Sequence, residues 1–364
     1  MIPIAYPVIE KEEKLLVEEV LNSRMLASGK YVETFERDFA KYSGAKFAIA
    51  TTNGTTALHA ALLMCGVKRG DKVVTTPFSF IATSNSILFC GAKPVFADID
   101  PQTFNISAES LEKVLKKEKN VKAVIIVHLY GLTCDMDAIL KLKKKYKFKL
   151  IEDACQAHGA QYKGKKAGSF GDAAAFSFYA TKNMMTGEGG IVLTNDAKAD
   201  KYARQIINHG RDGHSTFTVL GYNYRLTNLA AAIGIAQLGK LEKWILKRTE
   251  NAQKYNNAFK ELDFIKTPFV PENSRHVFHQ YTVRVKAGER NKFMNYLKEN
   301  GVGCGIYYDT VLYRQPYYKK LGYKAGLCPQ AEKAAKEAVS LPVHPSLSDS
   351  DTDKIIKVIK GYKK

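Results

Sequence analysis

The chain has 364 residues, of which 45% are hydrophobic and 25% are charged, and its formal net charge is +19. This length suits one large domain plus a smaller one, and the composition is that of a soluble globular protein. No apolar run is long enough to cross a bilayer, and the N-terminal residues lack the basic and apolar regions of a signal peptide. We therefore expect a cytoplasmic protein with no membrane partner.

The excess of lysine does not predict a nucleic-acid-binding protein. The lysines are scattered over predicted helices such as LEKVLKKEKN and LKKKYKF. Nucleic-acid binding would favour positive charge gathered on one face, with aromatic residues to stack on bases. A positive surface field would instead attract small anionic substrates. The six cysteines form no CxxC pair and no zinc-like cluster, so we expect neither disulfides nor a metal site.

The predicted elements begin with an amphipathic helix over residues 8–22. From residue 46, short apolar strands alternate with helical stretches, which predicts an α/β fold with a mainly parallel sheet covered on both faces. After a helical stretch at 228–262, the pattern changes to a strand in HVFHQYTVRV and helices in RNKFMNYLKENG and DTDKIIKVIKGYK. We divide the chain into a large domain, 1–244, which includes an N-terminal arm, and a smaller C-terminal α+β domain, 245–364.

The first stretch that could carry chemistry is TTNGTTALHAAL, at residues 51–62. A strand ends here, Asn53 and Gly54 turn the chain, and a helix is predicted to begin at Thr55 or Thr56. Free N–H groups and the helix dipole make such a helix N-terminus a phosphate site. Strand–turn–helix junctions with glycine are common, so this stretch alone indicates little.

The second stretch is KLIEDACQAHGA, at residues 149–160. A buried strand delivers Glu152 and Asp153 at its C-terminal end, where ligands bind in open α/β sheets. A carboxylate at this place could pair with a cationic ring nitrogen of a cofactor. Taken alone, the motif is better explained by a helix-capping aspartate.

The third stretch is SFYATKNMMTGEGG, at residues 177–190, in which Lys182 has no charged neighbour for several residues. A lysine at the end of an apolar strand is partly desolvated, which lowers its pKa and frees the amine as a nucleophile toward carbonyls. Gly187, Gly189 and Gly190 let the backbone turn and approach a ligand. A lysine without this context would be an ordinary surface residue.

Together the three stretches indicate a pyridoxal-phosphate site. The phosphate needs backbone amides, the ring nitrogen needs a carboxylate to stay protonated, and the C4′ carbonyl needs an amine. Lys182 follows Asp153 by 29 residues. The order of phosphate-binding helix, aspartate and lysine fits the large domain of fold-type I enzymes, which share the fold of aspartate aminotransferase.

Over nearly its whole length the chain resembles the DegT/DnrJ/EryC1/StrS family of sugar aminotransferases. The matching segments are IPIAYPVI, LASGKYVETFERDFAKYSGAKFAIATTNGTTALHAAL, TTPFSFIATSNSILFCGAKPVFADID, VHLYG, IEDACQAHGA, SFYATKNMMTGEGG, GYNYRLTNLAAAIGIAQL and LPVHPSLSD.

The resemblance implies that Lys182 forms the internal aldimine with pyridoxal phosphate and then moves protons as a general acid–base. Asp153 would keep the pyridinium nitrogen protonated. The other implied cofactor contacts are Gly54, Thr55, Thr56, Phe80, Gln156 and Ser177, with pyridoxamine phosphate as the intermediate form. Asn223 would reach the phosphate from a neighbouring subunit, with Arg225 close by, so a homodimer with shared active sites is expected.

The implied reaction transfers an amino group from glutamate to C3 or C4 of a nucleotide-diphosphate keto-deoxysugar, as in polysaccharide, glycan or antibiotic-sugar biosynthesis. The implied substrate contacts are Arg225, Glu188, Tyr307, Tyr308 and Tyr313. The segment 305–318 departs from the family pattern at Asp309, Val311 and Tyr313, which leaves the identity of the sugar open. A second departure is Cys155, whose side chain is small enough to fit under the cofactor ring. Two alternatives keep the fold: a pyridoxamine-phosphate-dependent sugar dehydratase, which would typically replace the lysine with histidine, and a non-catalytic regulatory protein.

Overall fold

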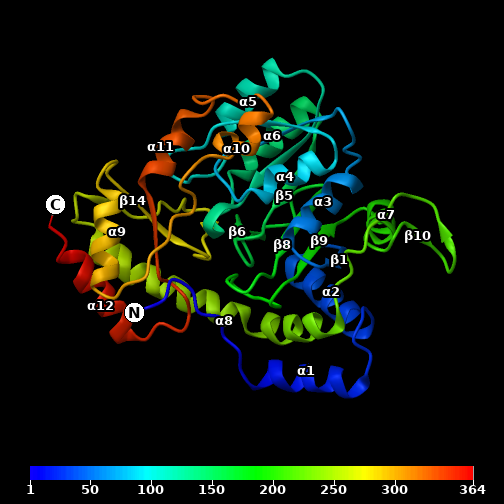
Figure 1. Cartoon of the computed structure of the whole chain (residues 1–364), viewed down its shortest axis with the longest axis horizontal. Coiled ribbons are helices and arrows are strands. Elements are labelled where there is room, and N and C mark those ends of the chain that lie inside the picture. Colours follow the sequence, from blue (N-terminus) through cyan, green and yellow to red (C-terminus); the bar gives the residue numbers. More distant parts are fainter. Residues whose placement is uncertain (364) are drawn as a thin grey trace.

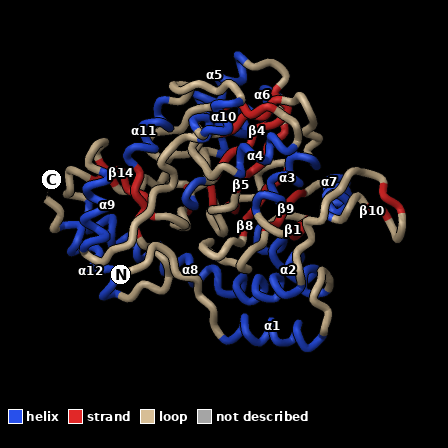
Figure 2. The backbone as a smooth tube through the Cα atoms, viewed as in Figure 1, coloured by secondary structure: helices blue, strands red, loops and turns tan. Residues whose placement is uncertain are grey.

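A mainly parallel sheet covered by helices on both faces forms the centre of the computed structural model, which describes residues 1–363 (Figures 1 and 2). The strand order is β1-β9-β8-β5-β4-β2-β3, and only β9 runs antiparallel to its neighbours. This arrangement confirms the predicted α/β class. The strands of the sheet are β1 (Phe47–Thr51), β2 (Lys72–Thr75), β3 (Lys93–Phe96), β4 (Val121–Val127), β5 (Lys149–Asp153), β8 (Ala173–Ser177) and β9 (Gly190–Thr194).

The helices of the described chain range from one turn to the long α8 (Figure 1). They are α1 (Lys11–Ser23), α2 (Lys30–Ser43), α3 (Gly54–Met64), α4 (Ala82–Phe89), α5 (Ala108–Lys117), α6 (Met136–Tyr146), α7 (Ala197–Ile207), α8 (Asn228–Phe259), α9 (Arg290–Glu299), α10 (Pro316–Lys320), α11 (Pro329–Glu337), α12 (Asp349–Lys360), and the 3₁₀ helices η1 (Leu129–Gly131) and η2 (Leu312–Arg314). None of them combines the length and apolar composition of a membrane span.

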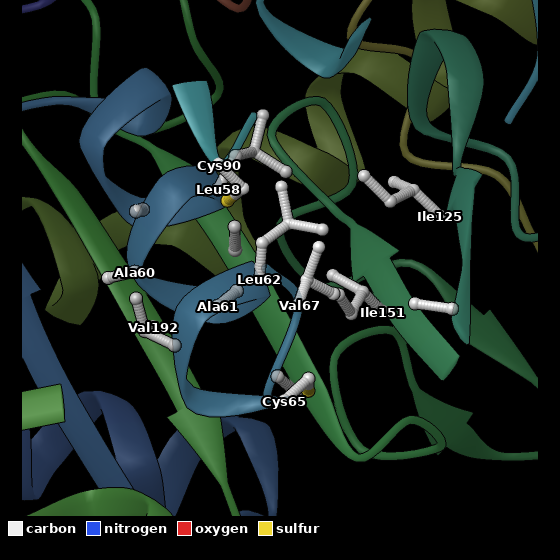
Figure 3. Packing of buried hydrophobic residues seen from close by; sticks show 14 of the residues in the cluster. Leu58, Ala60, Ala61, Leu62, Cys65, Val67, Cys90, Ile125, Ile151 and Val192 are labelled. Atoms are coloured by element: carbon white, nitrogen blue, oxygen red, sulfur yellow. The ribbon is translucent and has the colours of Figure 1, made fainter. Parts of the chain in front are cut away.

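Alternation along the strands divides the core of the large sheet into two faces. On one face Ile125, Ile151 and Val192 pack with Leu58 and Leu62 of α3, as Figure 3 shows from close by. On the other face, strand residues pack against α2 and α8 at one end of the sheet and against α5 and α6 at the other. Because both faces are buried, the strands read as nearly continuous apolar runs in the sequence.

A second core surrounds the three-stranded antiparallel sheet β12-β14-β15, formed by β12 (Ile265–Lys266), β14 (Tyr281–Val285) and β15 (Ala338–Leu341). The C-terminal half of α8, together with α9 and α12, packs on this sheet, and Ile2 of the N-terminal arm joins the same core. The domain division predicted at residue 245 falls inside the continuous helix α8. That helix therefore connects the two cores as one rigid element.

The remaining strands form small additions to the two cores. They are β6 (Gln161–Tyr162), β7 (Lys165–Lys166), β10 (Arg211–Asp212), β11 (Thr216–Phe217) and β13 (Ser274–Arg275). The β10–β11 hairpin projects from the body of the molecule near α7 (Figure 1), and Phe217 on it is 58% exposed. The hairpin leads directly into the GYNYR segment.

Replacing Phe39 tests the core under α2. Its fully buried ring makes edge-to-face contacts with Phe176 and Phe178, at centroid distances of 5.1 and 5.3 Å. We expect Phe39→Ala to lower the free energy of unfolding by about 3–5 kcal/mol, because it removes these contacts and leaves a cavity. The measurement is denaturant or thermal unfolding. Phe269→Ala, at a ring that is 47% exposed, should change stability by no more than about 0.5 kcal/mol.

Candidate active site

A cavity of about 970 Å³ lies where the parallel strands β4, β5 and β8 end. Its wall includes most residues that the sequence analysis selected. These are Gly54, Thr55, Thr56, Phe80, Asp153, Gln156, Ser177, Lys182, Glu188, Tyr307 and Tyr308. The volume is at the upper end of the range usual for small-molecule sites. The fold thus gathers side chains from five separate segments into one space.

Asp153 is the last residue of β5 and only 5% exposed. Its Oδ2 accepts a hydrogen bond from Thr83 Oγ1 at 2.7 Å, and its Oδ1 accepts one from the Cys155 N–H at 3.2 Å. Thr83 in turn shares a 2.8 Å hydrogen bond with Ser79. The carboxylate is therefore held in one orientation at the cavity wall.

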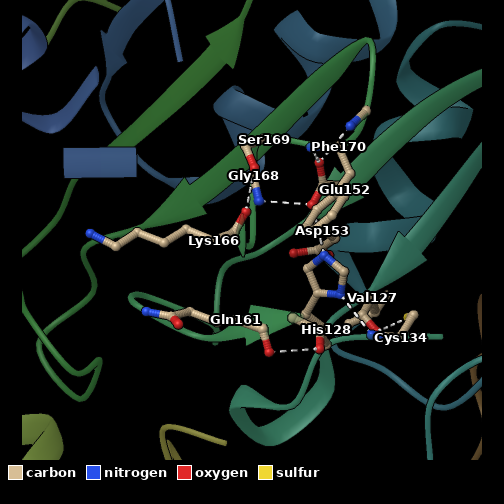
Figure 4. Close-up of polar contacts among 12 residues, drawn as sticks. Val127, His128, Cys134, Glu152, Asp153, Gln161, Lys166, Gly168, Ser169 and Phe170 are labelled. Atoms are coloured by element: carbon tan, nitrogen blue, oxygen red, sulfur yellow. Dashed lines mark hydrogen bonds and ion pairs between the residues drawn. The ribbon is translucent and has the colours of Figure 1, made fainter. Parts of the chain in front are cut away.

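Glu152, next to Asp153, points to the opposite face of the sheet and is fully buried (Figure 4). Its two oxygens accept hydrogen bonds from His128 Nε2 at 2.9 Å and from three backbone N–H groups, those of Gly168, Phe170 and Gly171, at 2.6–2.7 Å. Because His128 Nδ1 accepts the Cys134 N–H, its Nε2 carries the ring proton. Glu152 is thus satisfied within the protein, and of the two carboxylates only Asp153 faces the cavity.

Lys182 lies in the loop between β8 and β9, five residues beyond the end of β8, and not at the strand end that the sequence predicted. Its N–H donates to Tyr179 O at 2.9 Å, which turns the loop over the cavity. The amine makes no hydrogen bond or ion pair with any residue of the described chain. Burial lowers the pKa of this amine, since desolvation disfavours its charged form. A neutral amine is the nucleophilic form.

The N-terminus of α3 faces the same cavity. The helix begins at Gly54, one residue earlier than predicted, because Asn53 is the N-cap: its side chain accepts the Thr56 N–H at 3.0 Å. The N–H groups of Gly54 and Thr55 have no acceptor among residues 1–363. A Cβ on Gly54 would lie 2.7 Å from Ser177 Cβ, so only glycine lets the helix end approach β8 this closely. Two free amides and a hydroxyl form a cradle for a phosphate.

Aromatic side chains and an amide form another part of the cavity wall. Gln156 is fixed from both ends: its Oε1 accepts the Tyr130 N–H at 2.8 Å and its Nε2 donates to the Tyr308 hydroxyl at 3.2 Å. The rings of Phe80 and Tyr308 are 6.3 Å apart. Phe80 itself is 56% exposed, which leaves its ring free to stack on a flat ligand.

Three residues of the sequence-derived set do not line this cavity. Tyr313 was predicted to contact the substrate, and this is wrong: its ring is fully buried among Phe96 and other apolar residues, and its hydroxyl donates to Glu332 at 2.8 Å. The segment leaves the cavity after Tyr308, so Val311 is buried and Asp309 is exposed. Asn223 is exposed on its own chain, and Arg225 donates to Asn208 at 2.7 Å.

The structure also adds residues that sequence reasoning did not select. Thr83, His279, Gln280 and Thr181 line the cavity. Thr83 follows Ser79 by four residues, about one helical turn, and this spacing is the feature of the sequence that could have indicated that Thr83 belongs to the site. His279 comes from a distant segment, and nothing in its local sequence indicates a site.

The residues present fit pyridoxal phosphate. The cradle at Gly54 and Ser177 suits a phosphate, Asp153 offers a fixed carboxylate to a ring nitrogen, and Lys182 offers a free amine to a carbonyl. Within the described chain, no cluster of three His, Cys, Asp or Glu side chains suits a metal ion. Fold and site together define the class of α/β enzymes that carry this cofactor at the ends of parallel strands.

The comparisons place the chain within that class: it belongs to the DegT/DnrJ/EryC1/StrS aminotransferase family, whose model it matches over residues 7–360. A relative from Geobacillus stearothermophilus, named pleiotropic regulatory protein, is 42% identical over 98% of this chain and 96% of its own. The GDP-perosamine synthase of Caulobacter vibrioides is 37% identical over 98% of this chain and 97% of its own. The sugar aminotransferase Spr1654 of Streptococcus pneumoniae has been solved in a PLP form and a PMP form, and each superimposes on this chain with a TM-score of 0.93. The PLP form is 27% identical in sequence, and the match covers 99% of this chain and 97% of that one.

Replacing Gly54 tests the phosphate cradle. We expect Gly54→Ala to weaken pyridoxal-phosphate binding at least about tenfold, because the added methyl group meets Ser177 and pushes the end of α3 away. Titration of the apoprotein, followed by absorbance, measures this affinity. Gly239→Ala is the matched control, since nothing lies within 4 Å of a Cβ at this exposed position of α8. The control should keep the affinity and gain about 0.5–1 kcal/mol of stability. Equal affinities in both variants would contradict the cradle.

Proposed function

We propose that the protein is a pyridoxal-phosphate-dependent aminotransferase that moves an amino group from glutamate to C3 or C4 of a nucleotide-linked keto-deoxysugar. The observation that carries the proposal is the free amine of Lys182 in one cavity with the fixed carboxylate of Asp153. When bound, the cofactor supplies a carbonyl that reacts with amines and a ring that accepts electrons. Each role below belongs to a side chain or backbone group of this protein.

Lys182 would hold the cofactor through its amine and would then move protons at the substrate carbon. Desolvation lowers the pKa of this amine, which increases the share of its neutral, basic form. Asp153 would keep a proton on the ring nitrogen, and the hydrogen bond from Thr83 fixes the orientation of this carboxylate. Gln156 and Phe80 would hold the ring, and the N–H groups of Gly54 and Thr55 would bind the phosphate.

A nucleotide sugar is supported by the size of the cavity and by the relatives. A volume of about 970 Å³ exceeds what the cofactor alone requires. GDP-perosamine synthases are among the relatives, as is a UDP-2-acetamido-2-deoxy-3-oxo-D-glucuronate aminotransferase. Glu188, Tyr307 and Tyr308 line the cavity, and we assign them to the sugar.

A regulatory function is the second candidate, because the Geobacillus stearothermophilus relative carries that name. A regulator would have no need for a desolvated lysine beside a fixed aspartate in an open cavity. The same lysine disfavours the dehydratase alternative. Catalysis therefore explains more of the observed geometry than either alternative does.

Removing the Lys182 amine tests the reaction. The purified wild-type protein should absorb in the visible range after incubation with pyridoxal phosphate, and glutamate should remove this band. We expect Lys182→Ala to lose the band and to lower the transamination rate about a thousandfold or more, because both attachment and proton transfer are lost. Lys198→Ala, at an exposed lysine of α7, is the control and should behave as wild type. Full activity in Lys182→Ala would exclude the mechanism.

We further propose a homodimer in which Asn223 of each chain completes the site of the other. Asn223 is exposed at the base of the projecting β10–β11 hairpin and does not line the cavity of its own chain. A residue that projects outward can reach a phosphate only in a second copy. The neighbouring Arg225, held by Asn208, would stiffen this segment.

Mixing two inactive variants tests the shared site. Lys182→Ala and Asn223→Ala chains should each be impaired as homodimers. After the two variants are unfolded and refolded together, random pairing should make half of the dimers mixed. In a mixed dimer one of the two sites contains both Lys182 and Asn223, so about a quarter of wild-type activity should return. Activity that never exceeds the mean of the separate variants would show that Asn223 acts within its own chain. Size-exclusion chromatography with light scattering reports the oligomeric state.

A further inference from the structure

A second, much smaller cavity of about 20 Å³ shares Lys182 and Thr181 with the active-site cavity. Its other walls are residues 6–8 of the N-terminal arm, the loop that carries Lys182, and Gln237, Trp244 and Arg248 of α8. The spacing of these three helix residues places them on one face of α8. The arm, the loop and the long helix therefore meet around this space.

Arg248 is the unusual member of this wall. Its side chain is 6% exposed, yet its one hydrogen bond is from Nη1 to Phe278 O, at 3.1 Å. Its Nε is buried without an acceptor, and no carboxylate of residues 1–363 lies within ion-pair distance. Burial lowers the pKa of this guanidinium to about 10, so it stays positively charged at neutral pH. A buried charge without a partner is costly and calls for a compensating anion.

No Asp or Glu among residues 1–363 lines the cavity, so this part of the chain supplies no such anion. The nearby imidazoles of His279 and His344 have pKa values lowered first by burial, and for both the charge of Arg248 adds to the effect. Both rings are neutral and cannot offset the positive charge. His344 Nδ1, His279 Nδ1 and Asn251 Oδ1 are also buried without hydrogen-bond partners among the described residues.

We infer that this cavity binds a small monovalent inorganic anion, of which chloride is the representative, with Arg248 as its principal ligand. The centre of a water-sized occupant has about 20 Å³ available, which is room for a single small ion. A water molecule would fit but would leave the guanidinium uncompensated. An anion at this place also lies beside Lys182 and favours the protonated form of its amine. The inference does not depend on the proposed sugar chemistry.

Crystals of the purified holoprotein grown with bromide in place of chloride give the direct test. We expect an anomalous-scattering peak in the cavity, within hydrogen-bonding distance of Arg248 Nε. An ordered water without anomalous signal at this position would overturn the inference. This experiment uses the wild-type chain, so it does not depend on whether any variant folds.

Thermal unfolding gives the second test. At equal ionic strength, sodium chloride should raise the unfolding midpoint of the wild-type protein by about 1–3 °C relative to sodium gluconate, whose anion is too large for the cavity. Arg248→Met, which keeps the volume and removes the charge, should abolish this difference. Lys247→Met is the matched control, since Lys247 pairs with Glu250 and Asp349 and does not line the cavity. An equal chloride effect in Arg248→Met, or none in the wild type, would contradict the site.

Discussion

Side-chain alternation along β5 is the constraint on which the site depends. Two carboxylates follow one another at the end of this strand, and neighbouring residues of a strand point to opposite faces. Asp153 therefore faces the same side as Ile151, toward α3 and α4, where Thr83 holds it. Glu152 faces the other side and receives four hydrogen bonds there. One carboxylate serves the cavity, and its neighbour stabilises the loop that leads into β8.

Three ionisable side chains around this sheet, Glu152, Lys182 and Arg248, differ in the partners that the protein gives them. Glu152 is fully compensated by protein donors, so its negative charge stabilises the surrounding backbone. Lys182 makes no hydrogen bond or ion pair with residues 1–363, and desolvation lowers the pKa of its amine. Arg248 cannot respond in this way, because a guanidinium pKa near 10 still leaves it charged. The first arrangement supports structure, the second supports reactivity, and the third leads to our proposal of a bound anion.

Much of this architecture was predictable from local sequence. Strand–helix alternation predicted the parallel sheet, and the sequence motifs around Asn53, Asp153 and Lys182 predicted which segments approach the cavity. The prediction failed at Tyr313, in a segment that has no periodic pattern. The chain turns away from the cavity after Tyr308, so Tyr313 packs into the core beside Phe96. Spacing along the sequence does not encode where an irregular segment changes direction.

The sequence by itself determined the α/β fold, the family and the three segments that meet at the cavity, because each depends on local periodicity or on a short motif. Only the tertiary structure decided that Thr83 and His279 belong to the cavity wall, and that Arg248 is buried without a counter-charge from residues 1–363. These properties depend on contacts between residues far apart in the chain. Burial and hydrogen bonding arise from packing, and no local pattern specifies them.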